Sequence, residues 1–151
     1  MMLLNHYKFC KEKILVSIII ALLCSSCDKK FNSADVETAM KRYDRLVKKM
    51  DADSIALSYT KDGELGGIAK GRDSIRNFLA TFRNVKVLSQ VSQTSSIKIT
   101  GDSALQKGNY IQVVVVDNKD TVTVKGEYTA NWIWINKKEL LIKKMDTKPI
   151  K

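Results

Sequence analysis

The sequence contains a single histidine, three cysteines and one proline among its 151 residues. The histidine and all three cysteines lie within the first 27 positions, at His6, Cys10, Cys24 and Cys27. If that stretch is a removable leader, the remaining chain holds no imidazole and no thiol except that of Cys27. This excludes Ser/His/Asp and Cys/His catalysis, internal disulfides and the usual zinc sites from the mature chain.

The first 26 residues have the three parts of a secretory signal peptide. Three lysines precede an apolar run from Ile14 to Leu23, and the small pair Ser25 and Ser26 follows. The run is too short for a membrane-crossing helix, which needs about 20 residues. We therefore expect a signal peptide over residues 1–26, with an uncleaved N-terminal helix anchor as the alternative.

The segment Leu22-Leu23-Cys24-Ser25-Ser26-Cys27 resembles the lipobox of bacterial lipoproteins. It departs from that pattern at Cys24, where an aliphatic residue is usual. The resemblance implies cleavage before Cys27 and attachment of lipid, including palmitate, to the sulfur and the new amine of this residue. It also implies an anchored protein of the bacterial cell envelope, with residues 27–33 as a short tether between the membrane and the folded body.

Positive charge remains in excess without the leader. Removing its three lysines and one glutamate leaves 23 basic and 15 acidic residues, so the net charge falls from +10 to +8. Most of the bases are lysines spread in pairs along the chain, whereas a nucleic-acid site gathers them around stacking aromatic residues. We therefore expect no nucleic-acid partner, and a solvated surface that faces anionic lipid headgroups or cell-surface polymers.

Helical periodicity is confined to the first half of the mature chain. Val36, Met40 and Val47 belong to an apolar stripe at helical spacing, and Asn32 or Ser33 can cap the helix that this stripe predicts. The predicted helices span residues 34–50, a short segment through residues 55–57, and residues 72–82.

After residue 83 the pattern changes to β-favouring runs joined by polar turns. The predicted strands span residues 85–88, 96–100, 104–116, 121–135 and 140–145. Asp62-Gly63 predicts a further tight turn between short extended segments. Helices followed by a meander of strands are typical of the α+β class. We expect one domain over residues 34–147 and a C-terminal tail at residues 148–151.

This order of elements resembles the nuclear transport factor 2-like superfamily, which includes ketosteroid isomerase and the SnoaL-like polyketide cyclases. The resemblance implies an α+β fold in which N-terminal helices pack on a strongly curved antiparallel β-sheet, the cystatin-like cone. Because this fold hosts many unrelated functions, it does not fix the chemistry. The resemblance rests on the first helix and on the segments 57–63, 71–78, 128–132 and 140–142.

Ketosteroid isomerase-like enzymes use one carboxylate as a base and a second carboxyl as a hydrogen-bond donor. The resemblance places Gly66 or Gly67 at the first position and Ala130 or Asn131 at the second. None of these residues is an acid, and proton abstraction needs a base within reach of the proton. We therefore expect no isomerase chemistry of that type.

The resemblance also places a pocket between the helices and the concave face of the sheet. Strand alternation puts Tyr128, Trp132 and Trp134 on one face, if Ala130 points inward. The rings either bind an apolar or ring-bearing ligand, or they fill the core or cover the sheet in a homodimer. The candidate ligand-binding residues are Tyr43, Tyr59, Tyr110, Gln112, Tyr128, Trp132 and Trp134.

Three functions follow from these observations, none with an expected cofactor or metal. The first is a lipid-anchored protein that binds a small apolar ligand without catalysis, or dimerises. The second is a SnoaL-like isomerase, cyclase or dehydratase, favoured if Asp62 or Glu64 lies beside a tyrosine hydroxyl in an open pocket. The third is a protein-interaction module, favoured if Ile111, Val113 and Val115 are exposed on the outer face of the sheet.

Overall fold

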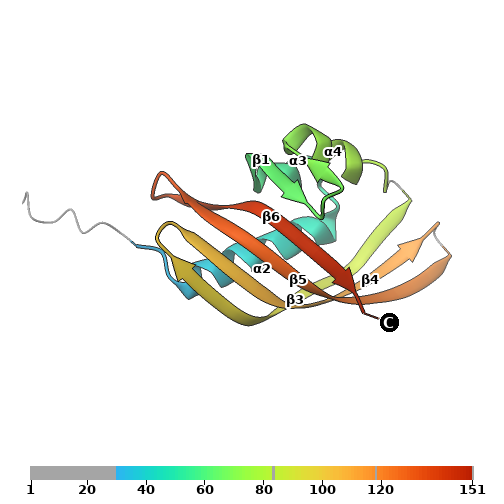
Figure 1. The fold of residues 1–151 in the computed structure, drawn as a ribbon. Helices are drawn as coiled ribbons and strands as arrows, with labels where there is room; N and C mark the ends of the chain where they lie inside the picture. Colours follow the sequence, from blue (N-terminus) through green and yellow to red (C-terminus); the bar gives the residue numbers. More distant parts are fainter. Residues whose placement is uncertain (1–29, 83, 118, 151) are drawn as a thin grey trace, which may run out of the picture. The chain divides into compact units, whose positions relative to one another are not determined.

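The computed structural model describes residues 30–150 apart from residues 83 and 118, so the predicted leader and Cys27 lie outside the described residues. From Phe31 onward the chain forms one compact unit. Helices precede a long meander of strands (Figure 1), which confirms the predicted α+β class. The elements are α2 (Ser33–Lys49), α3 (Ala52–Leu57), β1 (Tyr59–Leu65), β2 (Ala69–Lys70), α4 (Arg72–Leu79), β3 (Val85–Thr100), β4 (Ser103–Val116), β5 (Asp120–Ile135) and β6 (Glu139–Pro149).

Side-chain caps fix where the helices begin. Asn32 accepts hydrogen bonds from the first turn of α2, while Asp35 accepts one from the Asn32 backbone, which completes a capping box. Asp51 caps α3, where its side chain accepts a hydrogen bond from the backbone N–H of Ser54. Helix α4 ends at Leu79, short of the predicted Phe82, because the following residues tighten into turns with i to i+3 hydrogen bonds.

The sheet has six strands in the order β2-β1-β6-β5-β4-β3. All neighbouring pairs are antiparallel except β1 and β6, which run parallel, so the sheet is mixed where the sequence predicted an antiparallel one. Parallel neighbours need a long crossover. Here the chain between them contains β2, α4 and the strands β3 to β5.

The longest departure from the predicted strands is β3. The two predicted segments at 85–88 and 96–100 are the ends of one strand over Val85–Thr100, whose polar middle pairs with β4. The register shifts between Val87 and Ser89 and again between Thr94 and Ser96. Such bulges bend a strand and increase its twist, which suits a sheet that curves around a helix. At the other end of the sheet, β6 continues to Pro149, into the predicted tail.

Asp62-Gly63 does not form the predicted turn. Both residues lie within β1, and the chain turns instead at Gly66 and Gly67, which have positive φ angles. Gly63 allows a close approach, because a Cβ atom there would lie 2.9 Å from the Cβ atom of Tyr59. Gly63 therefore serves close packing rather than turn geometry.

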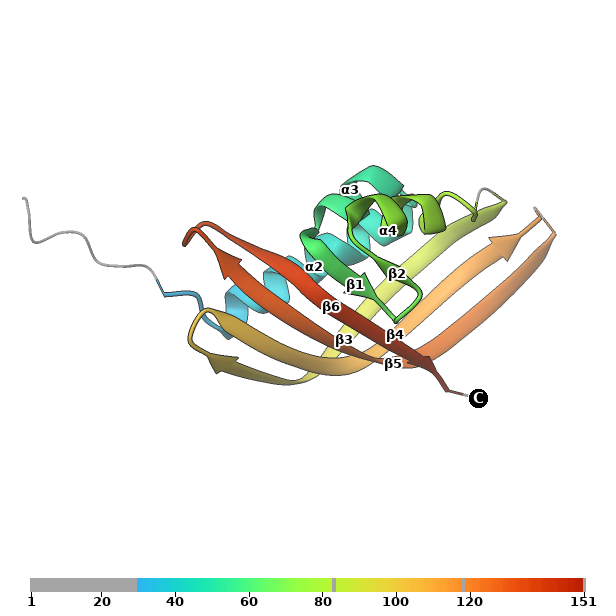
Figure 2. The ribbon, with the colours of Figure 1, turned by 45° about the horizontal axis from the view of Figure 1, so that its top comes forward.

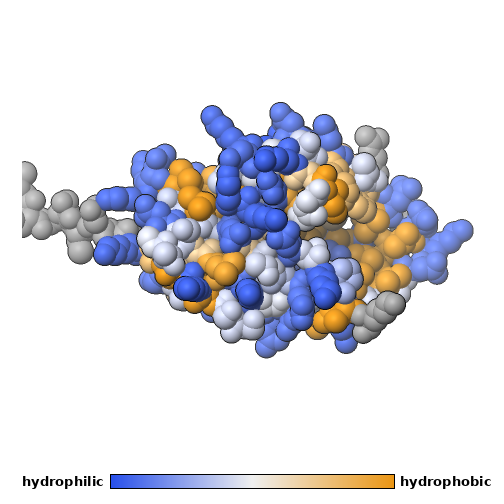
Figure 3. Space-filling model, in the orientation of Figure 1, coloured by the Kyte–Doolittle hydropathy of each residue, from blue (hydrophilic) through white to orange (hydrophobic). Residues whose placement is uncertain are grey.

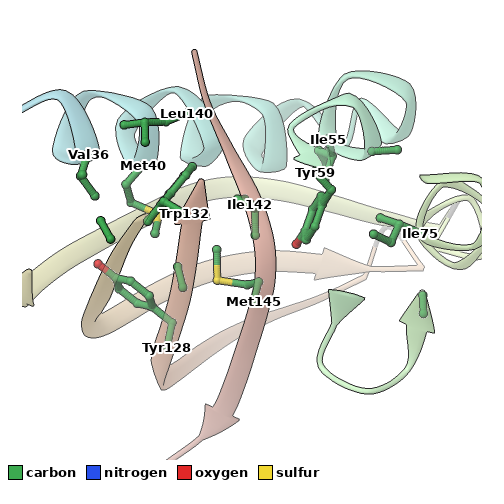
Figure 4. Packing of buried hydrophobic residues seen from close by; sticks show 14 of the residues in the cluster. Val36, Met40, Ile55, Tyr59, Ile75, Tyr128, Trp132, Leu140, Ile142 and Met145 are labelled. Carbon is green, nitrogen blue, oxygen red and sulfur yellow. The ribbon is translucent and has the colours of Figure 1, made fainter. Parts of the chain in front are cut away.

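Helix α2 runs along the concave face of the sheet, and α3 and α4 lie beyond its C-terminal end (Figure 2). Its buried residues Val36 and Met40 pack near Trp132 and Ile142 of the sheet (Figure 4). On β5, Tyr128, Ala130 and Trp132 are buried, as the alternation predicts. The helices cover this face unevenly, and the space between α2 and α4 is where the candidate site lies.

Candidate functional site

A cavity of about 300 Å³ lies between the helices and the concave face of the sheet. Most of the side chains that line it form two walls of opposite character, and Tyr43 and Met145 complete the lining. The wall from α2, β1, α4 and the turn that follows is apolar, and Figure 3 shows apolar side chains gathered beside α4. Its residues are Met40, Val47, Leu65, Phe78, Leu79 and Phe82. The second wall, here called the sheet wall, comes from strands β3 to β6 and consists of polar residues, namely Gln90, Ser92, Tyr110, Gln112, Tyr128 and Thr147.

Two glycines make room for the tyrosines of the sheet wall. Tyr128 lies opposite Gly108 and Tyr110 lies opposite Gly126 in the pairing of β4 with β5. A Cβ atom on Gly108 would lie 2.8 Å from the Tyr128 ring, and one on Gly126 would lie 2.5 Å from the Tyr110 ring. Each ring therefore lies against the backbone of the neighbouring strand, and the two glycines set the position of the cavity floor.

A buried carboxylate joins α2 to the sheet wall. Asp44 is 9% exposed and accepts hydrogen bonds from the backbone N–H of Ser92 at 2.8 Å and from its hydroxyl at 2.7 Å. It also accepts one from the Gln90 amide nitrogen at 3.2 Å. Asp44 does not line the cavity, but it orients two residues that do.

The hydroxyls of Tyr43 and Tyr59 lie 3.0 Å apart. Tyr59 is fully buried, whereas Tyr43 keeps partial exposure because it lines the cavity. Burial raises the pKa of Tyr43 to about 12 and raises the pKa of Tyr59 well above its ordinary value. Both hydroxyls are therefore neutral hydrogen-bonding groups at pH 7.

Of the seven candidate residues, Tyr43, Tyr110, Gln112 and Tyr128 line the cavity. Tyr59 contacts it only through Tyr43.

The two tryptophans belong to the packing around the cavity. Trp132 is 1% exposed in the core, and Trp134 stacks on Phe31 with ring centroids 5.4 Å apart. Neither lines the cavity.

Sequence reasoning missed Asp44, Gln90 and Ser92. The available signal for Asp44 was an acid beside the apolar stripe in the middle of α2, beyond the first turn where acids are expected. Nothing in the local pattern indicated Gln90 or Ser92, because the polar middle of β3 was not recognised as a strand.

Asp62 and Glu64, the acids nearest to the position of the ketosteroid isomerase base, each pair with a lysine. Asp62 accepts hydrogen bonds from Lys143 and Thr60, which lower its pKa, and Glu64 pairs with Lys70 at 3.2 Å. The described lining residues include no carboxylate, lysine, arginine or histidine. Burial also raises the pKa values of the lining tyrosines, Tyr110 and Tyr128. The cavity therefore offers neutral hydrogen-bonding groups rather than a base.

The outer face of the sheet carries some of the exposed apolar surface that an interaction module needs. Ile111 is 47% exposed and Val91, its partner across the strand pair, is 57% exposed. Val113 and Val115 are half-buried.

Neither a membrane-spanning helix nor a metal cluster occurs in the described part of the chain. Over residues 30–82, 84–117 and 119–150, no helix is long and apolar enough to cross a membrane. The same residues contain no group of three or more histidine, cysteine, aspartate or glutamate side chains that could hold a metal ion.

Comparison with known proteins agrees with this architecture. Residues 32–145 match the family model of the SnoaL-like domain. A ketosteroid isomerase-like protein from Erwinia carotovora atroseptica has 16% identity and a TM-score of 0.69, over 80% of this chain and 99% of that one. No curated protein matches the chain in sequence.

Two further solved structures have the same fold. A protein assigned as a calcium/calmodulin-dependent protein kinase II association domain, from Xanthomonas campestris, has 18% identity and a TM-score of 0.70, over 80% of this chain and 89% of that one. ActVI-ORFA from Streptomyces coelicolor has 17% identity and a TM-score of 0.65, over 77% and 95%. The predicted resemblance to the ketosteroid isomerase-like and SnoaL-like fold is thus confirmed, and identities this low show the fold alone.

Proposed function

The chain belongs to the SnoaL-like family, and we propose that it is a lipid-anchored protein of the bacterial cell envelope whose cavity binds a neutral, largely apolar small molecule. Membership of this family alone leaves the activity open, because one fold hosts many chemistries. The proposal therefore rests on the residues of the cavity.

The observation that carries the proposal is the pairing of an apolar wall with a neutral polar wall. A cavity of about 300 Å³ is within the range of small-molecule sites. Its hydrogen-bonding groups are amides and hydroxyls, and the hydroxyl of Tyr43, with a pKa of about 12, stays protonated at neutral pH. Such groups orient a ligand, whereas abstraction of a proton needs a base poised near the working pH. This supports binding over catalysis.

Native mass spectrometry of the domain purified from its own cells tests this proposal. We expect an additional bound mass in the wild-type protein and its loss in Gln112→Trp, because Gln112 lines the cavity and a tryptophan there would fill it. Ile111→Trp is the matched control, since the adjacent residue on β4 is exposed and does not line the cavity.

Retention of the mass by Gln112→Trp would place the ligand elsewhere and contradict the proposal. The same spectra report whether the domain is a monomer or a homodimer. A chemically altered ligand released from the wild-type protein would favour the enzymatic alternative.

The proposed anchor is lipid on Cys27, and it rests on the sequence of the leader. Metabolic labelling with palmitate should label the wild-type chain and Cys24→Ser but not Cys27→Ser. Equal labelling of wild type and Cys27→Ser would contradict the anchor without affecting the proposal for the cavity.

A further inference from the structure

We infer that the outer face of the sheet, which is turned away from the helices, lies on anionic lipid headgroups of the membrane in which Cys27 anchors the protein. The inference rests on the proposed lipid anchor and adds which side of the domain meets the membrane. It follows from the lysines on this face, from a hollow between them and from the short chain that separates Cys27 from Phe31.

Lysines from all four long strands lie on the outer face. Residues directly opposite each other in a sheet share a face, and neighbours along a strand alternate. Gln112 lines the cavity, so its neighbour Ile111 and the residue opposite Ile111, Lys125, face outward. The same register places five exposed lysines on this side, namely Lys86, Lys98, Lys107, Lys125 and Lys148. We call the surface that they share the basic face.

Acids do not neutralise the basic face. None of its five lysines forms an ion pair with another described residue. Two acids share the face: Asp146 pairs with Lys144 at 3.6 Å, and Glu127 lies opposite Lys148. By contrast, residues 33–79, which supply the helices and the strands β1 and β2, hold nine basic and eight acidic side chains. Positive charge is therefore concentrated on one side of the domain.

Exposed aliphatic side chains lie among these lysines. Val91, Ile111 and Lys125 form one row across β3, β4 and β5. This combination suits a bilayer surface, since ammonium groups bind lipid phosphates while lysine stems and aliphatic side chains contact the less polar layer beneath. A second copy of this chain fits the face less well, because two basic faces brought together would repel each other.

A hollow of about 450 Å³ opens on the basic face, and its lining includes Lys98, Leu105, Asn131 and Lys143. Lys143 is held by Asp62, so Lys98 supplies the ammonium group for a phosphate. The Asn131 amide adds a neutral hydrogen-bond donor. The hollow is therefore suited to the phosphate end of a lipid headgroup.

The proposed anchor holds one end of the sheet near the membrane. Phe31 is 6% exposed and stacks on Trp134, whose backbone N–H donates to the Asp102 oxygen at 2.7 Å in the turn between β3 and β4. Figure 2 shows the start of α2 beside this turn, and the strand ends on both sides of the turn line the hollow. Cys27 precedes Phe31 by four residues, which span at most about 14 Å when extended. Lipid on Cys27 thus keeps the hollow close to the bilayer, and the lysines decide which side of the domain turns toward it.

Quenching of a fluorescent probe tests which side meets the membrane. The mature lipoprotein has no cysteine after Cys27, whose sulfur is blocked by lipid, so an introduced cysteine can be labelled alone. The probe is attached to Asn109→Cys on the outer side of β4 or to Asn77→Cys on α4, and both asparagines are exposed. The labelled protein is inserted into phosphatidylcholine vesicles with or without phosphatidylglycerol, in which a nitroxide on the lipid headgroups acts as the quencher.

We expect the probe at position 109 to be quenched at least about 3-fold more than the probe at position 77 in the anionic vesicles. Salt at about 0.5 M, which shortens the Debye length to about 4 Å, should abolish the difference. Each lysine near an anionic surface strengthens association by about 5-fold, so Lys98→Gln with Lys107→Gln should bring the ratio below about 1.5. The matched control is Lys41→Gln with Lys48→Gln, which removes the same charge from exposed positions of α2 and should leave the ratio unchanged.

The outcomes separate this inference from the proposed function. Equal quenching at the two positions in anionic vesicles would overturn the inference and leave the anchor and the cavity standing. The same preference for position 109 in neutral vesicles would overturn it too, because the contact would not depend on charge. Equal quenching together with binding of dextran sulfate that requires Lys98 and Lys107 would assign the face to an anionic polymer instead. Failure of the protein to insert into either kind of vesicle would overturn the proposed anchor and this inference with it.

Discussion

The indole N–H of Trp132 donates to the side-chain oxygen of Gln106 at 2.8 Å, and both side chains are buried. The amide nitrogen of Gln106 donates in turn to the Thr94 hydroxyl at 2.9 Å. That hydroxyl lies 3.4 Å from the hydroxyl of Tyr128, at the floor of the cavity. A polar chain therefore connects the centre of the core with the candidate site.

Replacing Gln106 tests how much these hydrogen-bonded side chains contribute to folding stability. Gln106→Leu leaves the buried indole N–H without a partner, and we expect a loss of about 1–3 kcal/mol in the free energy of unfolding, measured with urea. Trp132→Phe removes the other partner. The double variant should be more stable than the sum of the single losses predicts, by about 1 kcal/mol. Strict additivity would contradict a direct interaction.

Alkaline pH should destabilise the fold through Tyr43. Its pKa is raised to about 12 in the folded protein from an ordinary value of 10.0. Between these values the unfolded chain releases its proton while the folded chain keeps it, so stability falls as pH rises. We expect a loss on the order of 2 kcal/mol between about pH 10 and 12. Tyr43→Phe should show a shallower fall, and parallel curves for the two proteins would contradict this assignment.

The two glycines beneath the tyrosines should respond differently to alanine. A Cβ atom on Gly108 would lie 2.1 Å from the backbone oxygen of Gln93, which cannot move away easily. Gly108→Ala should therefore cost about 3 kcal/mol of folding stability. At Gly126 the obstacle is the end of the Tyr110 side chain. Gly126→Ala should cost less than about 1 kcal/mol in thermal unfolding but reduce the bound mass seen by native mass spectrometry, because the ring moves toward the cavity.

The cap of α2 provides a test with an adjacent control. Asn32→Ala removes the side-chain oxygen that accepts from the backbone N–H groups of Ala34 and Asp35, so we expect a loss of about 1 kcal/mol in the free energy of unfolding. Ser33→Ala should change it by less than about 0.5 kcal/mol, since Ser33 is the first helical residue and an alanine favours the helix. A larger effect at Ser33 would contradict the capping box.

The elements that follow a local hydrophobic pattern could be predicted from the sequence. The stripe through Val36 and Met40 located α2, and the alternation of Tyr128, Ala130 and Trp132 identified the inward face of β5. The polar middle of β3 could not be recognised, because its strand structure comes from pairing with β4 and not from its own propensity. Likewise, the close approach at Gly63 depends on Ile142, which is distant in the sequence.

The candidate site could be predicted only in part, because the sequence shows which residues share a strand face but not what covers them. Tyrosines on the inward face of a long strand are visible in a sequence, and Tyr110 and Tyr128 do line the cavity. Whether a ring lines a cavity or fills the core depends on which helix covers it, so Trp132 could not be distinguished from Tyr128 in advance. Asp44 and its partners come from segments far apart in the chain, and only the packing of α2 on β3 brings them together.

The sequence by itself determined the order of the elements, the inward face of β5 and the lack of histidine and cysteine beyond position 27, because these depend on residue type and short-range periodicity. Only the tertiary structure decided which polar groups face the cavity. The direction of a hydrogen bond depends on its partner, and the partner of Gln90 and Ser92 lies on a helix more than forty residues earlier. A buried carboxylate on that helix orients both side chains, which no local pattern in β3 could indicate.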